Sequence, residues 1–129
     1  MRPPRFVVPL VLVAVVVAAA GCGSPTAYDL DKSRACLAEQ PRLTISDKVD
    51  FIASNALGGA IRVKLLGNQV TLSFADNRQE AERIVRAYQR FKGANIGLED
   101  VLRPTKNVVV LWVAHPSETA EQTIRDCLK

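Results

Sequence analysis

Residues 60–75 read AIRVKLLGNQVTLSFA, and this stretch decides the fold. Apolar and polar residues alternate on both sides of Gly67-Asn68, a favourable two-residue turn for a β-hairpin. If Leu66 pairs with Gln69, the apolar side chains of both strands share one face. These side chains are Ile61, Val63, Leu65, Val70, Leu72 and Phe74. The stretch therefore predicts a hairpin with one face in the core.

A helix is predicted directly after the hairpin, over residues 76–92. Asp76 and Gln79 form a capping box at its start, and Gly93 ends it. One apolar stripe recurs at helical spacing: Ala81, Ile84, Val85, Tyr88 and Phe91. The opposite side carries Arg83, Arg86 and Arg90. We interpret it as a solvated face on which Glu82 pairs with Arg86, the alternative being contact with anionic lipid.

The rest of the chain adds one strand and shorter helices. Residues 94–106 form a long connection with one turn of helix inside it. Residues 107–114 are apolar on both faces, which indicates a strand that is central or covered on both sides. Ser117 caps a last helix, and residues 31–38 form a first helix that stops before Pro41. Residues 45–57 are ambiguous and read as a helix if Ser46 or Asp47 caps it.

This order of elements predicts a small α+β domain over residues 30–129. We expect a two-layer sandwich in which a three-stranded sheet, the hairpin plus one strand, has helices packed on one face. The apolar residues on the outer face of the last strand then need cover from the N-terminal segment or from a partner.

The first 21 residues have the pattern of a secretory signal peptide. Arg2 and Arg5 precede an apolar run from residue 6 to residue 20, shorter than the about 20 residues that a spanning helix needs. An uncleaved single-span anchor is the alternative. The run ends in Ala19-Ala20-Gly21-Cys22, which resembles the lipobox of bacterial lipoproteins. The Arg-, Ala- and Val-rich composition resembles that of actinobacterial lipoproteins.

The resemblance implies where the protein is located and how it is attached to the membrane. Cys22 would become the first mature residue and carry a diacylglycerol group, with its freed amine as a site for acylation. The protein would then be exported and held by membrane lipid on the outer face of the bacterial cell membrane. Residues 22–29 would form a short lipidated tether. The leucine usual in this motif is Ala19 here.

Two further cysteines, Cys36 and Cys127, lie at opposite ends of the predicted domain. An oxidising compartment favours a disulfide between them, the alternative being two buried free thiols. The chain has one histidine and no C-x-x-C spacing, so we expect no metal site.

The net charge of the chain and the sequence motifs that it lacks exclude several classes of function. The chain has 17 Lys+Arg against 13 Asp+Glu, and removal of the signal segment lowers the formal net charge from +4 to +2. Such a mild surplus without clustered basic residues does not indicate nucleic-acid binding. The common hydrolase, metalloprotease, P-loop and dinucleotide motifs do not occur, and we expect no cofactor. The favoured interpretation is a non-catalytic binding or accessory module of the cell envelope whose partner is an envelope protein or ligand.

The candidate binding surface combines the polar face of the hairpin with the 94–106 loop, because both are expected to be exposed. Its residues are Arg62, Lys64, Thr71, Ser73, Asn95, Glu99, Asp100 and His115. The alternative is a small envelope enzyme or ligand sensor that uses the 94–106 loop and His115. An enzyme predicts a concave polar pocket there, whereas a binding module or a structural accessory subunit predicts an exposed apolar patch.

Overall fold

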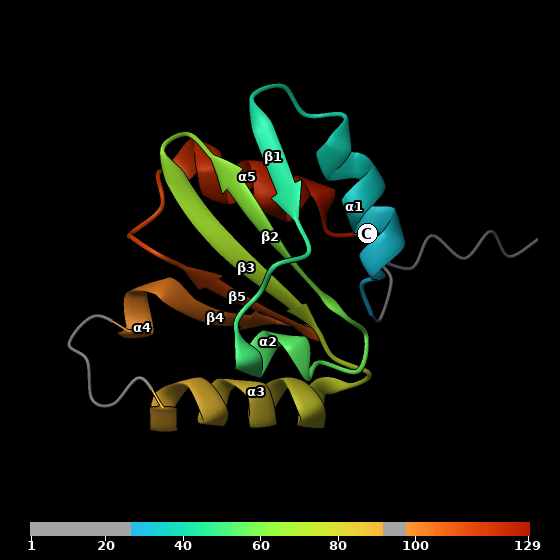
Figure 1. Ribbon diagram of the computed structural model, residues 1–129, viewed down its shortest axis with the longest axis vertical. Coiled ribbons are helices and arrows are strands. Elements are labelled where there is room, and N and C mark those ends of the chain that lie inside the picture. Colours follow the sequence, from blue (N-terminus) through green and yellow to red (C-terminus); the bar gives the residue numbers. More distant parts are fainter. Residues whose placement is uncertain (1–26, 92–97) are drawn as a thin grey trace, which may run out of the picture.

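The computed structural model describes residues 27–91 and 98–129, and these residues form the predicted α+β fold (Figure 1). The helices are α1 (Leu30–Ala38), α2 (Phe51–Ser54), α3 (Arg78–Phe91), α4 (Leu98–Val101) and α5 (Glu118–Cys127). The strands are β1 (Leu43–Ser46), β2 (Ala60–Leu65), β3 (Asn68–Phe74), β4 (Leu102–Thr105) and β5 (Val108–Trp112).

The sheet has five strands in the order β1-β2-β3-β5-β4, and every neighbouring pair is antiparallel. The predicted three-stranded sheet was therefore too small. Its three strands are the central ones, and β1 and β4 add an edge on each side. Both missed strands have four residues. β4 contains Pro104, which an edge strand tolerates because one side of the strand needs no backbone donor.

The hairpin β2–β3 is present, but its turn and register differ from the prediction. Leu65 pairs with Asn68, so the turn residues are Leu66 and Gly67, both with positive φ. This register is two residues away from the predicted one, and a shift of two keeps every side chain on its face. The reason lies in Asn68, whose side chain exchanges hydrogen bonds with the backbone of Ala114 and fixes the start of β3 beside the end of β5.

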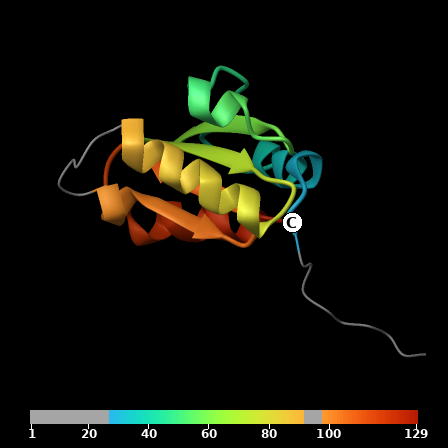
Figure 2. The same ribbon diagram turned by 90° about the horizontal axis from the view of Figure 1, so that it is seen from below.

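Helices cover both faces of the sheet, which corrects the predicted two-layer arrangement (Figure 2). On one face, α1 and α5 pack on the predicted apolar face of the hairpin, in a cluster that includes Leu37, Ile61 and Ile124. On the other face, α2 and α3 pack on a second cluster that includes Ile84 and Val109. The apolar outer face of β5 is thus covered by the chain itself.

The starts of α2 and α3 are set by side-chain caps. Asn77 accepts a hydrogen bond from the Glu80 N–H, so α3 begins at Arg78, two residues after the predicted start. Asp50 accepts one from the Ala53 N–H and caps α2, in place of the predicted Ser46 or Asp47. The turn of helix predicted inside residues 94–106 is α4.

The predicted disulfide joins Cys36 in α1 to Cys127 in α5, with a Cα–Cα distance of 5.3 Å. Close by, the Asp29 N–H donates to the Lys129 carbonyl, and the Tyr28 N–H donates to Asn107 Oδ1. Among the described residues, which begin at residue 27, Tyr28 is the first that hydrogen-bonds to the folded domain. Within the described ranges, no helix has the length and apolar character needed to cross a membrane.

Candidate functional site

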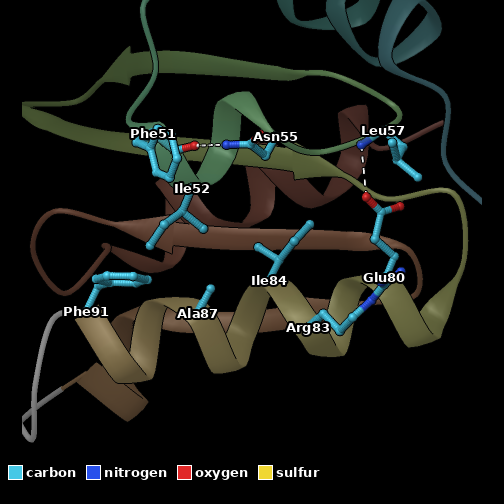
Figure 3. Close-up of a pocket in the computed structure, with 9 residues that line it drawn as sticks. All are labelled: Phe51, Ile52, Asn55, Leu57, Glu80, Arg83, Ile84, Ala87 and Phe91. Carbon is cyan, nitrogen blue, oxygen red and sulfur yellow. Dashed lines mark hydrogen bonds between the residues drawn. The ribbon is translucent and has the colours of Figure 1, made fainter.

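A groove lies between α2 and α3, on the face of the molecule away from the disulfide (Figure 3). It has a volume of about 410 Å³. Its lining is mainly apolar and comes from both helices and the segment that follows α2. The lining residues are Phe51, Ile52, Asn55, Leu57, Glu80, Arg83, Ile84, Ala87 and Phe91.

The periodicity of α3 explains why one helix contributes to both the core and the groove. Ile84 and Tyr88 point into the sheet and are 7% and 1% exposed. Ile84 also lines the groove together with Glu80, Ala87 and Phe91, because residues three, four and seven positions apart share one face. The face of α3 that packs in the core and the face that forms one wall of the groove therefore overlap, and Ile84 belongs to both.

Glu80 joins the two walls of the groove. Its side chain is buried, and its carboxylate accepts hydrogen bonds from the backbone N–H of Leu57 at 2.9 Å and of Asp76 at 2.6 Å. Leu57 follows α2, whereas Asp76 precedes α3. A charged acceptor makes stronger bonds than a neutral one. The carboxylate therefore fixes the end of α2 against the start of α3.

A second contact fixes the other end of α2. The buried Tyr88 hydroxyl donates to the Asp50 carboxylate, with distances of 3.0 and 2.9 Å to its two oxygens. Burial raises the pKa of Tyr88 above its ordinary value, and the hydrogen bond and negative charge of Asp50 raise it further. Asp50 thus caps α2 and ties it to α3 at the same time.

The groove exposes large apolar side chains at its rim. Phe51, Leu57 and Phe91 are 80%, 69% and 73% exposed. Figure 3 shows the rings of Phe51 and Phe91 at one end of the groove and Leu57 at the other, with Ile52 and Ile84 between them. The predicted apolar stripe placed Phe91 in the core, and this was wrong. Phe91 is the last residue of α3 and does not pack under the sheet.

Arginines follow the solvent side of the same helix. Arg83, Arg86 and Arg90 are exposed, and the spacing of three and then four residues puts them in one row. Glu82 pairs with Arg78 at 3.6 Å, and not with Arg86 as predicted. Among the described residues, no carboxylate lies within ion-pair distance of the three arginines. The row thus places uncompensated positive charge beside the groove.

The polar face of the hairpin is not the exposed surface that the sequence predicted. Thr71 is 5% exposed and Ser73 is fully buried, because α2 and α3 cover this face. Arg62 is half-buried, and its Nε atom is buried without a hydrogen-bond partner in the described part of the chain. Lys64 alone of the four is exposed. The alternation marked the two faces correctly but did not reveal a second helical layer.

The predicted loop residues lie elsewhere on the molecule. Glu99 and Asp100 are exposed on α4, and His115 is exposed between β5 and α5. Asn95 and Cys22 lie outside the described residues, as do the signal segment and most of the tether. In the two described ranges, no three His, Cys, Asp or Glu side chains come together as a set that could hold a metal ion.

The groove residues were missed in the sequence for a physical reason. Residue type alone does not distinguish an exposed phenylalanine or leucine from a buried one. Whether Phe51 or Leu57 is exposed depends on where the sheet that would cover it ends. The one available signal was the row of Arg83, Arg86 and Arg90, which marked the solvent side of α3.

Comparisons of the chain with protein-family models, curated proteins and solved structures give no match.

Proposed function

We propose that this protein is a lipid-anchored, non-catalytic binding module of the bacterial cell envelope, and that the α2–α3 groove is its binding surface. The observation that carries the proposal is the convergence of Phe51, Leu57 and Phe91, all largely exposed, on one groove. Single exposed apolar residues are common, whereas a contiguous patch marks an interaction site.

The rigidity of the groove supports a role in recognition. Glu80 and Tyr88 hold the two ends of α2 against α3 through hydrogen bonds to the Leu57 N–H and to Asp50. A preformed groove loses little conformational entropy when a partner binds. The apolar lining also fits binding better than catalysis, since catalysis requires convergent polar groups with tuned pKa values.

The proposed anchor keeps this surface close to the membrane. Five residues lie between Cys22 and Tyr28, which is the first of the described residues to hydrogen-bond to the domain. Fully extended, the six residue steps from Cys22 to Tyr28 reach about 20 Å. With diacylglycerol on Cys22, the groove would meet proteins embedded in or attached to the outer face of the membrane. An envelope protein is therefore the partner that we propose.

The test is capture of partners from native membranes. Cells expressing the full chain are crosslinked, complexes are purified through a C-terminal tag, and the recovered proteins are quantified. Phe51→Ser with Phe91→Ser is expected to remove the partner at unchanged abundance and membrane association. The control is Leu66→Ser with Val113→Ser, which replaces two exposed apolar residues outside the groove. Equal capture by both double variants would refute the groove as the binding surface.

A further inference from the structure

We infer that the partner presents an amphipathic α-helix with an acidic flank to the α2–α3 groove. This inference rests on the proposed function and adds the chemistry of the partner. It follows from the length of the groove, the position of its apolar residues and the charge beside it.

The groove has the length of a short helix. Its α3 wall runs from Glu80 to Phe91. At a rise of 1.5 Å per residue this is about 16 Å, or three helical turns. Apolar contacts are available along its whole length, from Leu57 at one end through Ile84 to Phe51 and Phe91 at the other (Figure 3). A helix with apolar residues at positions i, i+3 or i+4, and i+7 matches this distribution.

The positive charge beside the groove favours a partner helix with acidic residues on one side. The row of Arg83, Arg86 and Arg90 follows the α3 wall at helical spacing, and Arg83 itself lines the groove. Glu80, the acidic residue in the groove lining, already accepts two backbone hydrogen bonds. A helix that lies parallel to α3 would meet these arginines along one flank. Asp or Glu residues on that flank would supply the missing negative charge.

The same features disfavour two other occupants. A second copy of the chain would bring its own arginine row beside this one, and like charges repel. An anionic bilayer would attract the arginines and admit Phe51 and Phe91. However, a flat surface does not fill a groove of about 410 Å³ between two helices. An acidic helix satisfies the charge and fills the groove.

Site-specific photocrosslinking identifies the occupant directly. A benzophenone-bearing amino acid replaces Leu57 or, in a second variant, Ala87, both of which line the groove. The full chain is expressed in the organism's own cells, irradiated, and digested, and the crosslinked peptide is sequenced by mass spectrometry. We expect a segment of another protein with apolar residues at helical spacing and Asp or Glu on one side.

Charge reversal tests the acidic flank separately. Arg83→Glu with Arg90→Glu should lower the crosslink yield about tenfold, since the change removes two attractive charge pairs and replaces them with repulsion. The matched control is Lys32→Glu with Arg103→Glu, which makes the same charge change on exposed residues of α1 and β4. This control should leave the yield unchanged.

The outcomes separate the two proposals. Crosslinks to lipid, to a second copy, or to a protein segment without acidic residues would overturn the acidic helix, as would equal yields from the two charge-reversed pairs. Crosslinks to any other protein segment would still support the groove as a binding surface. Absence of crosslinks from both positions would overturn both proposals.

Discussion

Replacement of Glu80 tests whether one buried carboxylate holds the groove together. The Glu80 carboxylate accepts from the Leu57 N–H at 2.9 Å and from the Asp76 N–H at 2.6 Å. Hydrogen bonds to charged groups contribute about 1.5–3 kcal/mol each. Both donors belong to exposed residues, so water replaces part of each lost bond. We therefore expect Glu80→Ala to lower the free energy of unfolding by about 3 kcal/mol.

The assay is urea unfolding at pH 7 with the disulfide intact, followed by the fluorescence of the single tryptophan, Trp112, which is buried. Glu82→Ala is the matched control on the same helix, because Glu82 is exposed and makes only a 3.6 Å surface pair with Arg78. Glu82→Ala should lower the free energy of unfolding by about 0.5 kcal/mol or less. Glu80→Gln keeps one acceptor oxygen and should fall between the two. Equal losses of unfolding free energy for Glu80→Ala and Glu82→Ala would refute the role of the Glu80 carboxylate in holding the groove together.

Three further predictions concern stability and anchoring. Because the pKa of Tyr88 is raised above its ordinary 10.0, the unfolded chain loses this proton first, and stability falls as the pH rises past about 10. Between pH 9 and pH 11 the parent protein should lose about 1 kcal/mol more than Tyr88→Phe in urea unfolding, and parallel pH profiles would contradict this. Cys36→Ser with Cys127→Ser should lower the unfolding free energy by about 4–5 kcal/mol, because the bond closes a loop with a sequence separation of 91; a loss under 1 kcal/mol in the same assay would contradict the estimate. Intact mass analysis of the membrane fraction should find a product that starts at Cys22 and carries diacylglycerol, whereas an unmodified product or one retaining Met1 would rule out the anchor.

Local patterns in the sequence were sufficient for the central elements of the fold. Alternation placed Ile61 and Val70 on one face of a hairpin, and the 3.6-residue period placed Ile84 and Tyr88 on the inner side of a helix. Both patterns depend on neighbouring residues alone. The disulfide was predictable because an oxidising compartment favours pairing and, with Cys22 expected to carry lipid, Cys36 and Cys127 are the one pair left.

The pairings between distant segments were not predictable in the same way. β1 and β4 have four residues each, too few to establish a period, and they become strands only by pairing with β2 and β5. The polar alternation at Thr71 and Ser73 fits equally well a face in water and a face under a second helical layer. The groove is lined by α2 and α3, the missed second helical layer, so the sequence predicted a binding module but not its surface.

Amide hydrogen exchange of the free protein and of the purified complex tests the central claim most directly. If the groove is the binding surface, the partner should slow exchange in α2, at Leu57 and along α3, while the β2–β3 turn and residues 113–116 exchange as in the free protein. Slower exchange confined to the turn, to α4 or to the segment around His115, with α2 and α3 unchanged, would contradict the account.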